Sequence, residues 1–169
     1  LTVNPEAAHV LLRSSSSLGS RITRSFRAQQ EEVIRYLYND GTSCFHLSTD
    51  TWKTKHGHKH FQAVNVQFVD SNGLLVRLLL DLVEVDGEER KSGAYLATLL
   101  IQTIEDYNLT ARLGWITSDN VGVNDTLVRA IERFMRANGY TQWQEKTRRL
   151  RCIGHIINLA TQAFMFSVD

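Results

Sequence analysis

Cysteine and proline are scarce in this 169-residue chain, which contains two cysteines and one proline. Two thiols, Cys44 and Cys152, are too few for a disulfide scaffold, so we expect reduced thiols in an intracellular protein, with a single bridge as the alternative. An excess of one charge is also absent, since the formal net charge is +1. Only local basic clusters could therefore indicate nucleic-acid binding. The length favours one domain with a sizeable core.

A long hydrophobic run is missing as well. The most apolar stretch, residues 74–85, is interrupted by Arg77 and Asp81 and is shorter than the ~18 residues that a membrane span needs. The first residues lack a signal peptide and an initiator methionine. We therefore expect no membrane association, and we expect a fragment of a longer protein.

The first 42 residues predict a helical segment. A short helix fits residues 6–13, and the serine- and glycine-rich residues 14–20 predict a flexible loop. A helical period then begins at Ser20 and ends before Gly41, with Ile22, Phe26 and Leu37 among the residues near one face. We divide the chain into this N-terminal segment, 1–42, and a core, 43–169.

Three strands are predicted next. Residues 44–50 alternate between apolar and polar, residues 60–69 are rich in valine and phenylalanine, and residues 70–73 form a hairpin-type turn. Residues 74–85 carry apolar side chains on both faces, which is typical of a central strand covered on both sides.

The rest of the core alternates between helices and strands. The expected elements are a helix capped by Ser92, a strand at 112–117, a helix capped by Asn124 or Asp125 and ended by Gly139, a strand at 150–153, and a helix at 155–166 that buries Ile156, Ala160, Ala163 and Phe164. The order β-β-β-α-β-α-β-α predicts an α/β fold with a mixed sheet and flanking helices, as in RNase H-like proteins.

Two aspartates end strands of this predicted sheet. Asp50 ends the first strand and Asp119 the fourth, so residues far apart in sequence can converge at one edge. Convergent carboxylates are what a hard cation such as Mg²⁺ requires, and two such ions about 4 Å apart can promote phosphodiester cleavage. The alternative is that each aspartate only stabilises a turn. Spacing alone does not decide between these interpretations.

Four short segments resemble motifs of the hAT transposases. STDTWKT at residues 48–54 resembles D-x-W-[ST]-S, KSGAYLA at 91–97 resembles H-S-G-E-N-I-A, SDNVGVND at 118–125 resembles D-N-A-x-N-N/D, and RCIGHIINL at 151–159 is similar to R-C-x-x-H-x-x-N-L. The resemblance extends from about Ser20 to Phe166 with the motifs in the family's order. The sequence departs from it at Lys91, where the family has histidine, and at Ala94, where it has glutamate.

The resemblance implies an RNase H-like core for cut-and-paste DNA transposition that uses Mg²⁺ or Mn²⁺ in a two-metal site. Asp50 would be the first acid and Asp119 the second, both as metal ligands, and His155 would lie near them as a catalytic residue. Trp52, Asn120 and Cys152 would support the site. The family's third acid is a glutamate beyond a helical insertion, so we expect it downstream of residue 169 and expect this fragment to be inactive alone.

For Cys152 and His155 two alternatives stay open. The two residues share one helix face at i, i+3. They could be a packed thiol and a hydrogen-bonded histidine, or half of a zinc site that lacks a second pair of ligands.

Two basic segments flank the predicted site. Lys53, Lys55 and Lys59 lie in a histidine-rich turn after the first acid, and Arg148, Arg149 and Arg151 precede the last motif. Both could contact DNA phosphates, and both could be solvated loops. Of the tryptophans, we expect Trp52 to pack under the site, Trp115 to lie in the core and Trp143 to be exposed.

Two functions remain after these observations. The chain is either part of an active transposase that binds transposon-end DNA in the nucleus, or a domesticated relative that serves as a DNA-binding or protein-interaction module without catalysis. Retention of both aspartates favours the first. We also expect self-association, because part of residues 74–85 would stay exposed without covering helices.

Overall fold

The computed structural model describes residues 14–55, 59–85 and 92–166. The predicted helix at 6–13 lies outside these residues, as do the middle of the histidine-rich turn and the predicted end of the third strand at Asp86. The chain divides into two compact units, the first ending at Asn39 and the second beginning at Asp40. Among the described helices, none is long and apolar enough to cross a membrane.

The first unit contains almost all of helix α2 (Ser15–Asp40). The flexible loop expected at residues 14–20 is therefore wrong. Ser14 caps the helix, because its hydroxyl oxygen accepts the backbone N–H of Ser17 at 3.2 Å and its carbonyl accepts that of Leu18 at 3.1 Å. Of the predicted apolar face, Leu37 is buried, whereas Ile22 and Phe26 are exposed.

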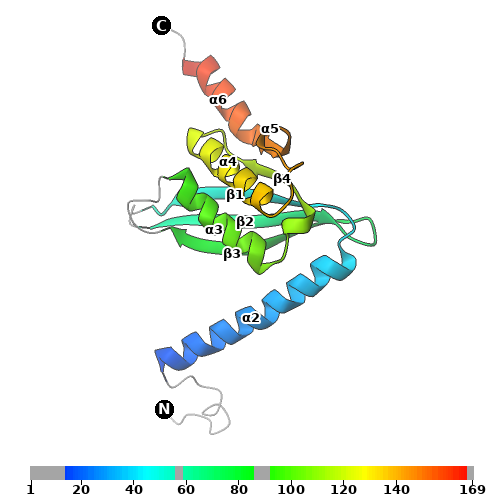
Figure 1. Ribbon diagram of the computed structural model, residues 1–169. Helices are drawn as coiled ribbons and strands as arrows, with labels where there is room; N and C mark the ends of the chain where they lie inside the picture. Colours follow the sequence, from blue (N-terminus) through cyan, green and yellow to red (C-terminus); the bar gives the residue numbers. More distant parts are fainter. Residues whose placement is uncertain (1–13, 56–58, 86–91, 167–169) are drawn as a thin grey trace. The chain divides into compact units, whose positions relative to one another are not determined.

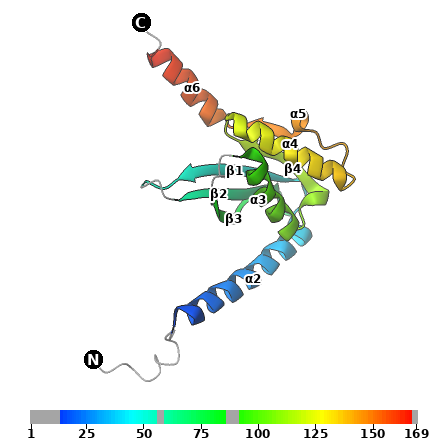
Figure 2. The same cartoon turned by 60° about the vertical axis from the view of Figure 1, so that its left-hand side comes forward.

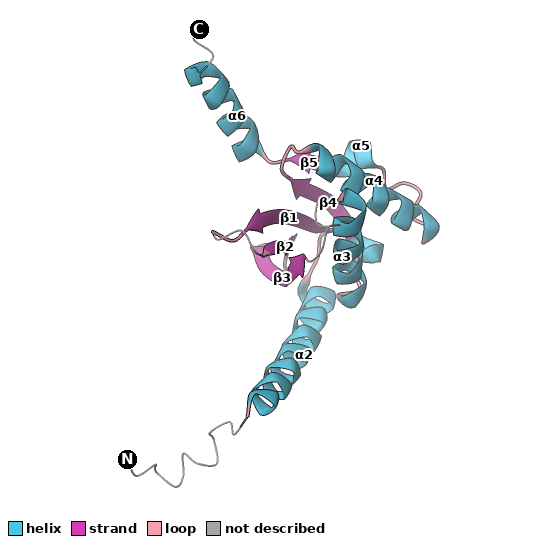
Figure 3. Ribbon diagram, turned by 90° about the vertical axis from the view of Figure 1, so that its left-hand side faces the viewer, coloured by secondary structure: helices cyan, strands magenta, loops and turns pink. Residues whose placement is uncertain are grey.

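The second unit is built on a five-stranded mixed sheet (Figure 3). Its strand order is β3-β2-β1-β4-β5, with antiparallel pairing among the first three and parallel pairing of β1 with β4 and of β4 with β5. The strands are β1 (Phe45–Lys53), β2 (His60–Val69), β3 (Leu75–Val85), β4 (Leu113–Ser118) and β5 (Arg149–Arg151). This architecture confirms the predicted mixed α/β fold.

The turn between β2 and β3 has the expected chemistry. The Oδ1 atom of Asp70 accepts the backbone N–H groups of Asn72 at 2.9 Å and Leu74 at 2.8 Å. Gly73 has a φ of 79°, a conformation that side chains with a Cβ rarely adopt. The local sequence thus fixes this hairpin and, with it, the start of β3.

Helices α3 (Gly93–Asp106) and α4 (Gly122–Ala137) lie side by side on one face of the sheet (Figures 1 and 2). Both belong to right-handed crossovers that run in the same direction across the sheet, so both helices reach the same face. Their apolar stripes form the core with the inward residues of the strands, namely Leu96, Leu100, Ile104, Leu127, Ile131, Met135, Phe45, Leu47, Val64, Val66 and Phe68.

The caps of these helices differ from the predicted ones. Ser92 stands at the N-cap of α3, but its side chain makes no capping hydrogen bond. Helix α4 begins after Val121, so Asn124 and Asp125 lie in its first turn. Both side chains contact other parts of the chain instead of capping the helix.

The tryptophan assignments are reversed. Trp143 is only 3% exposed, and its indole N–H donates to the carbonyl of Gly114 at 2.9 Å. Trp115 is 38% exposed and stacks on His46 with ring centroids 4.7 Å apart. A strand residue and a loop residue thus exchange their expected environments, because the hydrogen bond to Gly114 brings the loop over the end of the core.

The last elements are α5 (Glu145–Arg148), β5 and α6 (Ile153–Phe166), with the short 3₁₀ helix η2 (Thr110–Arg112) before β4. No residue of α6 is buried, and Phe164 is 83% exposed. The predicted buried stripe of this helix is therefore wrong. The residues are apolar at helical spacing, but none is buried among the described residues.

Strand β3 lies at the edge of the sheet, which contradicts the predicted central position. We call the face opposite α3 and α4 the open face. On β1 it carries His46, Ser48, Asp50 and Trp52, whose β2 partners are Gln67, Asn65, Ala63 and Phe61. On β3 it carries Leu79, paired with Asn65 and 59% exposed, and Leu82, paired with Ala63 and 51% exposed. The apolar residues on both faces of β3 thus belong to an edge strand with one covered face.

The close approach of α3 and α4 predicts that Gly93 is essential for stability. A Cβ at this position would clash with the carbonyl oxygen of Val123 and lie 2.8 Å from the Cβ of Thr126. We expect Gly93→Ala to lower the free energy of unfolding by about 2 kcal/mol, measured by urea denaturation. Gly122→Ala, whose added Cβ meets nothing within 4 Å, is the control. Equal stability of the two variants would contradict this packing.

The exposed leucines of β3 predict self-association. We expect concentration-dependent association in sedimentation velocity, because a contiguous apolar surface on a sheet edge favours contact with another copy. The double variant Leu79→Glu/Leu82→Glu should sediment as a monomer. Leu74→Glu, which changes an exposed leucine outside the strand, should behave like the parent. A parent that stays monomeric at high concentration would refute the prediction.

Candidate functional site

A cavity of about 450 Å³ opens on the sheet near the ends of β1 and β4. Residues from four elements and the segment after β4 form its wall. They are Ser48, Thr49, Asp50, Asn65, Thr117, Ser118, Asp119, Cys152, Gly154, His155 and Asn158. Both predicted acids, the predicted histidine and Cys152 are therefore among its lining residues.

The pairing of β1 with β4 explains why the two acids meet. The strands are parallel, and Ser48 is paired with Thr117. Asp50 lies two residues after Ser48, and Asp119 lies two residues after Thr117. Both carboxylates therefore lie toward the C-terminal ends of these parallel strands, on the same face of the sheet. Adjacent strands are about 4.8 Å apart, which brings two such side chains within reach of one ion.

Asp50 is an exposed residue on the open face. Its neighbour across the β1–β2 pairing is Ala63, which has a small side chain. On the opposite face the preceding residue, Thr49, is buried and accepts a hydrogen bond from Gln62 at 3.1 Å. The sheet therefore fixes the backbone of Asp50 while its carboxylate stays accessible from the cavity.

Asp119 is held by the start of α4. Its Oδ1 atom accepts hydrogen bonds from the side-chain amide of Asn124 and from the backbone N–H of Val121, the latter at 3.4 Å. Among the described residues, none donates to Oδ2. One carboxylate oxygen is thus tied to the helix N-terminus, and the other is free to bind a ligand.

His155 and Cys152 come from the start of α6. Cys152 follows β5, where its backbone N–H donates to the carbonyl of Ser118 at 2.9 Å, and its own carbonyl accepts the N–H of Ile156 at 3.2 Å. This hydrogen-bonded turn places Cys152 and His155 in the wall that contains the acids. Their catalytic and supporting roles stay predictions. Among the described residues, no three histidine, cysteine or acidic side chains form a group that could hold a metal ion, and the zinc alternative stays a prediction.

Six polar residues of the cavity wall were missed by the sequence interpretation, namely Ser48, Thr49, Asn65, Thr117, Ser118 and Asn158. Ser48 and Asn65 are partners across the β1–β2 pairing, and Asn158 lies one turn after His155 on α6. Asn158 belongs to the last motif, so that motif could have identified it. Asn65 is visible only once the strand register is known.

The other predicted supporting residues lie outside the cavity wall. Trp52 is exposed rather than packed under the site, and it stacks on Phe61 with centroids 5.9 Å apart. Asn120 does not line the cavity either, and its buried Oδ1 atom has no hydrogen-bond partner. Trp52 is therefore a neighbour of the site on the open face, and Asn120 a residue of the turn behind it.

The six predicted DNA-contacting residues also have separate surroundings, and none lines the cavity. Lys53 and Lys55 are exposed, whereas Lys59 pairs with Glu84 at 2.8 Å. Arg148 lies over the ring of Trp115, 5.5 Å from its centroid. Arg151 is half exposed and lies 3.8 Å from Asp125.

The predicted DNA contact of Arg149 is contradicted by its surroundings. Its side chain is only 6% exposed and forms an ion pair with Asp125 of α4, so it is not free to contact DNA. Burial lowers the pKa of its guanidinium, and Arg151 lowers it further, while Asp119 raises it. The residue connects β5 to the first turn of α4 and thereby supports the cavity wall.

Trp115 and His46 contact each other on the open face. The Nδ1 atom of His46 accepts the backbone N–H of Trp115 at 3.0 Å, which requires a neutral imidazole. Burial and the nearby Arg148 both lower the pKa of His46. This histidine connects β1 to β4 through Trp115 and is not among the residues that line the acidic cavity.

The donor chemistry of the cavity fits a hard divalent cation. Asp50 and the free oxygen of Asp119 would supply two carboxylate ligands, and Ser48 and Asn65 would add neutral oxygens from the same wall. Mg²⁺ commonly binds through one or two carboxylates and keeps several waters. Metal binding by this set stays a prediction.

Comparison with known proteins gives two matches. A relative from Talaromyces stipitatus, named "Putative transcriptional regulator tpeD", is 29% identical over 150 residues. The match covers 89% of this chain and 17% of that protein, so the chain spans about a sixth of its length. The family model of the ZBED1 RNase-like domain matches residues 48–145, which include both aspartates and most of the sheet. The chain therefore belongs to the family of ZBED1 RNase-like domains.

Proposed function

We propose that this chain supplies the first two acids of a metal-dependent DNA transposase core that cleaves and joins DNA strands. The observation that supports the proposal is the convergence of Asp50 and Asp119 in one cavity. In the transposases that the motifs resemble, a third acid completes the site. The described cavity contains two acids, so we expect no cleavage by this chain without an additional ligand.

In this proposal Asp50 and Asp119 would hold Mg²⁺ or Mn²⁺. Such an ion would activate a water molecule and stabilise the leaving oxygen of a phosphodiester. The chain's own residues prepare the ligands. Asn124 and the N–H of Val121 orient Asp119, and the sheet orients Asp50. His155 lines the same cavity and would donate a hydrogen bond to a phosphate oxygen.

The substrate in this proposal is DNA, as in the transposases that the motifs resemble. Lys53 and Lys55 lie a few residues beyond Asp50 at the exposed end of β1, where they could contact the backbone of a strand entering the cavity. The natural target would be transposon-end DNA, and the protein would act in the nucleus.

A second function is favoured by the relative from Talaromyces stipitatus, which is named as a putative transcriptional regulator. The fold could serve as a DNA-binding or protein-interaction module without catalysis. In that case the two aspartates would stabilise turns, as Asp119 does through Val121 and Asn124. Measuring metal affinity distinguishes the two functions. Catalysis requires both carboxylates to bind a metal ion, whereas stabilising a turn does not.

The proposal predicts Mn²⁺ binding that depends on both acids. We expect Asp50→Asn and Asp119→Asn each to weaken Mn²⁺ binding by about tenfold or more, since each removes one of two anionic ligands. Binding is measured by calorimetry and by the electron paramagnetic resonance signal of free Mn²⁺. Asp106→Asn, which removes an exposed carboxylate on α3, should leave the affinity unchanged. Equal affinities in all four proteins would refute the catalytic proposal.

Asn124 is expected to act as a positioning residue. We expect Asn124→Ala to weaken Mn²⁺ binding by roughly tenfold, because outer ligands that orient a carboxylate contribute this much to metal affinity. Asn138→Ala is a matched control. It removes a side-chain hydrogen bond of 2.9 Å to Phe134 at the other end of α4, so it should change thermal stability but not metal affinity. The same metal affinity in both variants would rule out the role of Asn124.

A further inference from the structure

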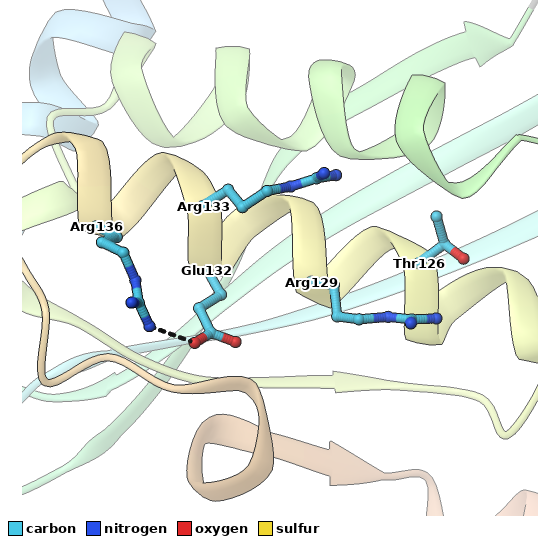
Figure 4. Close-up of a pocket in the computed structure, with 5 residues that line it drawn as sticks. All are labelled: Thr126, Arg129, Glu132, Arg133 and Arg136. Atoms are coloured by element: carbon cyan, nitrogen blue, oxygen red, sulfur yellow. Dashed lines mark hydrogen bonds and ion pairs between the residues drawn. The ribbon is translucent and has the colours of Figure 1, made fainter.

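Three arginines lie on the outward side of α4. Arg129, Arg133 and Arg136 are exposed and follow the spacing i, i+4, i+7, which places them on one face of the helix. The residues that α4 buries, Leu127, Val128, Ile131 and Met135, occupy the opposite face. Figure 4 shows the arginines with Thr126 and Glu132 along the helix, where these five residues line an open groove of about 580 Å³. We call this surface the α4 groove.

The positive charge of the α4 groove is only partly balanced. Arg136 pairs with Glu132 at 3.1 Å, shown by the dashed line in Figure 4. The other carboxylate oxygen of Glu132 accepts the backbone N–H of Glu145 at 3.3 Å. Arg129 uses its Nε to donate to the carbonyl of Asp125 at 3.1 Å, and no residue in the described ranges pairs with Arg133. Two guanidinium groups therefore keep free N–H donors toward the groove.

Guanidinium groups are well suited to bind phosphate, as they are to bind carboxylate. Their planar array of donors matches phosphate oxygens, and they lose little hydration on binding. Seven residues separate Arg129 from Arg136, which is about 10 Å along the helix axis. Since phosphates of one strand recur about every 3.4 Å along a duplex, the three side chains can reach successive phosphates of one backbone. The hydroxyl of Thr126 adds a neutral donor at the end of the row.

We propose that the α4 groove is a docking surface for the phosphate backbone of duplex DNA. The positive charge of the groove supports binding of a polyanion. That this polyanion is DNA rests on the proposed function. The groove belongs to the helix layer, whereas the acidic cavity opens on the sheet. It is therefore a second DNA contact that positions the duplex without reading its sequence or touching the reacting phosphate.

The test measures binding of a fluorescein-labelled 30-base-pair duplex by fluorescence anisotropy. EDTA is present, so that no metal-mediated contact at the acidic cavity contributes. We expect Arg129→Gln/Arg133→Gln to weaken binding on the order of tenfold. The slope of log affinity against log salt should become shallower by about 1.8, at about 0.9 per lost phosphate contact. Arg133→Gln alone, which breaks no contact with a described residue, should make the same slope shallower by about 0.9.

The matched control is Arg24→Gln/Arg27→Gln, which removes two exposed arginines from α2. It should keep the affinity of the parent within about twofold and leave the salt slope unchanged. Equal losses in the two double variants would overturn the proposal, because the effect would then come from net charge. Stronger competition by polyglutamate than by unlabelled duplex would also overturn it, since the groove would then prefer an acidic protein segment.

Mn²⁺ titration of the same proteins separates this inference from the proposed function. The Arg129→Gln/Arg133→Gln protein should bind Mn²⁺ as the parent does, which supports a surface independent of the cavity. If the parent binds Mn²⁺ but shows no affinity for the duplex in EDTA, the α4 groove proposal fails and the metal site stands. If duplex binding depends on Arg129 and Arg133 while Mn²⁺ binding is absent, the groove stands and the catalytic proposal fails.

Discussion

The parallel register between β1 and β4 is the constraint on which the candidate site depends. With Ser48 opposite Thr117, the strands carry Asp50 and Asp119 to the same edge and the same cavity. A shift of β1 by one residue would turn Asp50 toward the helix layer, where Thr49 and Gln62 are buried. An unpaired carboxylate there would lose its hydration, so the apolar residues Phe45 and Leu47 select the register that also forms the site.

Helix α4 has three distinct surfaces, and each has a different role in this account. Its apolar stripe packs into the core, and its first turn holds one oxygen of Asp119 through Asn124. Asp125, the next residue, pairs with the buried Arg149 and so connects the helix to β5. The outward arginines are left for solvent or a partner. A single helix thus links the sheet edge, the orientation of an acid and a basic surface.

The sequence predicts best what depends on local pattern. The richness in valine and phenylalanine gives β2 with its observed ends, and the turn at Asp70 and Gly73 follows from local hydrogen bonding. Prediction from the sequence fails where the burial of a residue depends on residues far away in the chain. Trp143 is buried because the carbonyl of Gly114 accepts its N–H, and the stripe of α6 is exposed because no described residue covers it.

The same distinction applies to the site. Asp50 and Asp119 could be selected from their motifs, and the structure brings them together in one cavity. The prediction that Asp50 ends the first strand is wrong, because β1 continues to Lys53. The sequence predicts that Arg149 contacts DNA or lies in a solvated loop, but its environment is set by Asp125 on another element. Asn65 carries no motif, and only its pairing with Ser48 reveals it as a residue of the cavity. Charge and spacing in sequence cannot supply such tertiary pairings.

The most direct test of the account is whether Asp50 and Asp119 hold the same ion. In an NMR titration, Mn²⁺ should broaden the amide resonances of both residues with one midpoint, because a paramagnetic ion between the carboxylates is close to both. The account predicts that Asp50→Asn removes the broadening at residue 119 as well. Broadening at residue 119 that persists with an unchanged midpoint in that variant would contradict a shared cation.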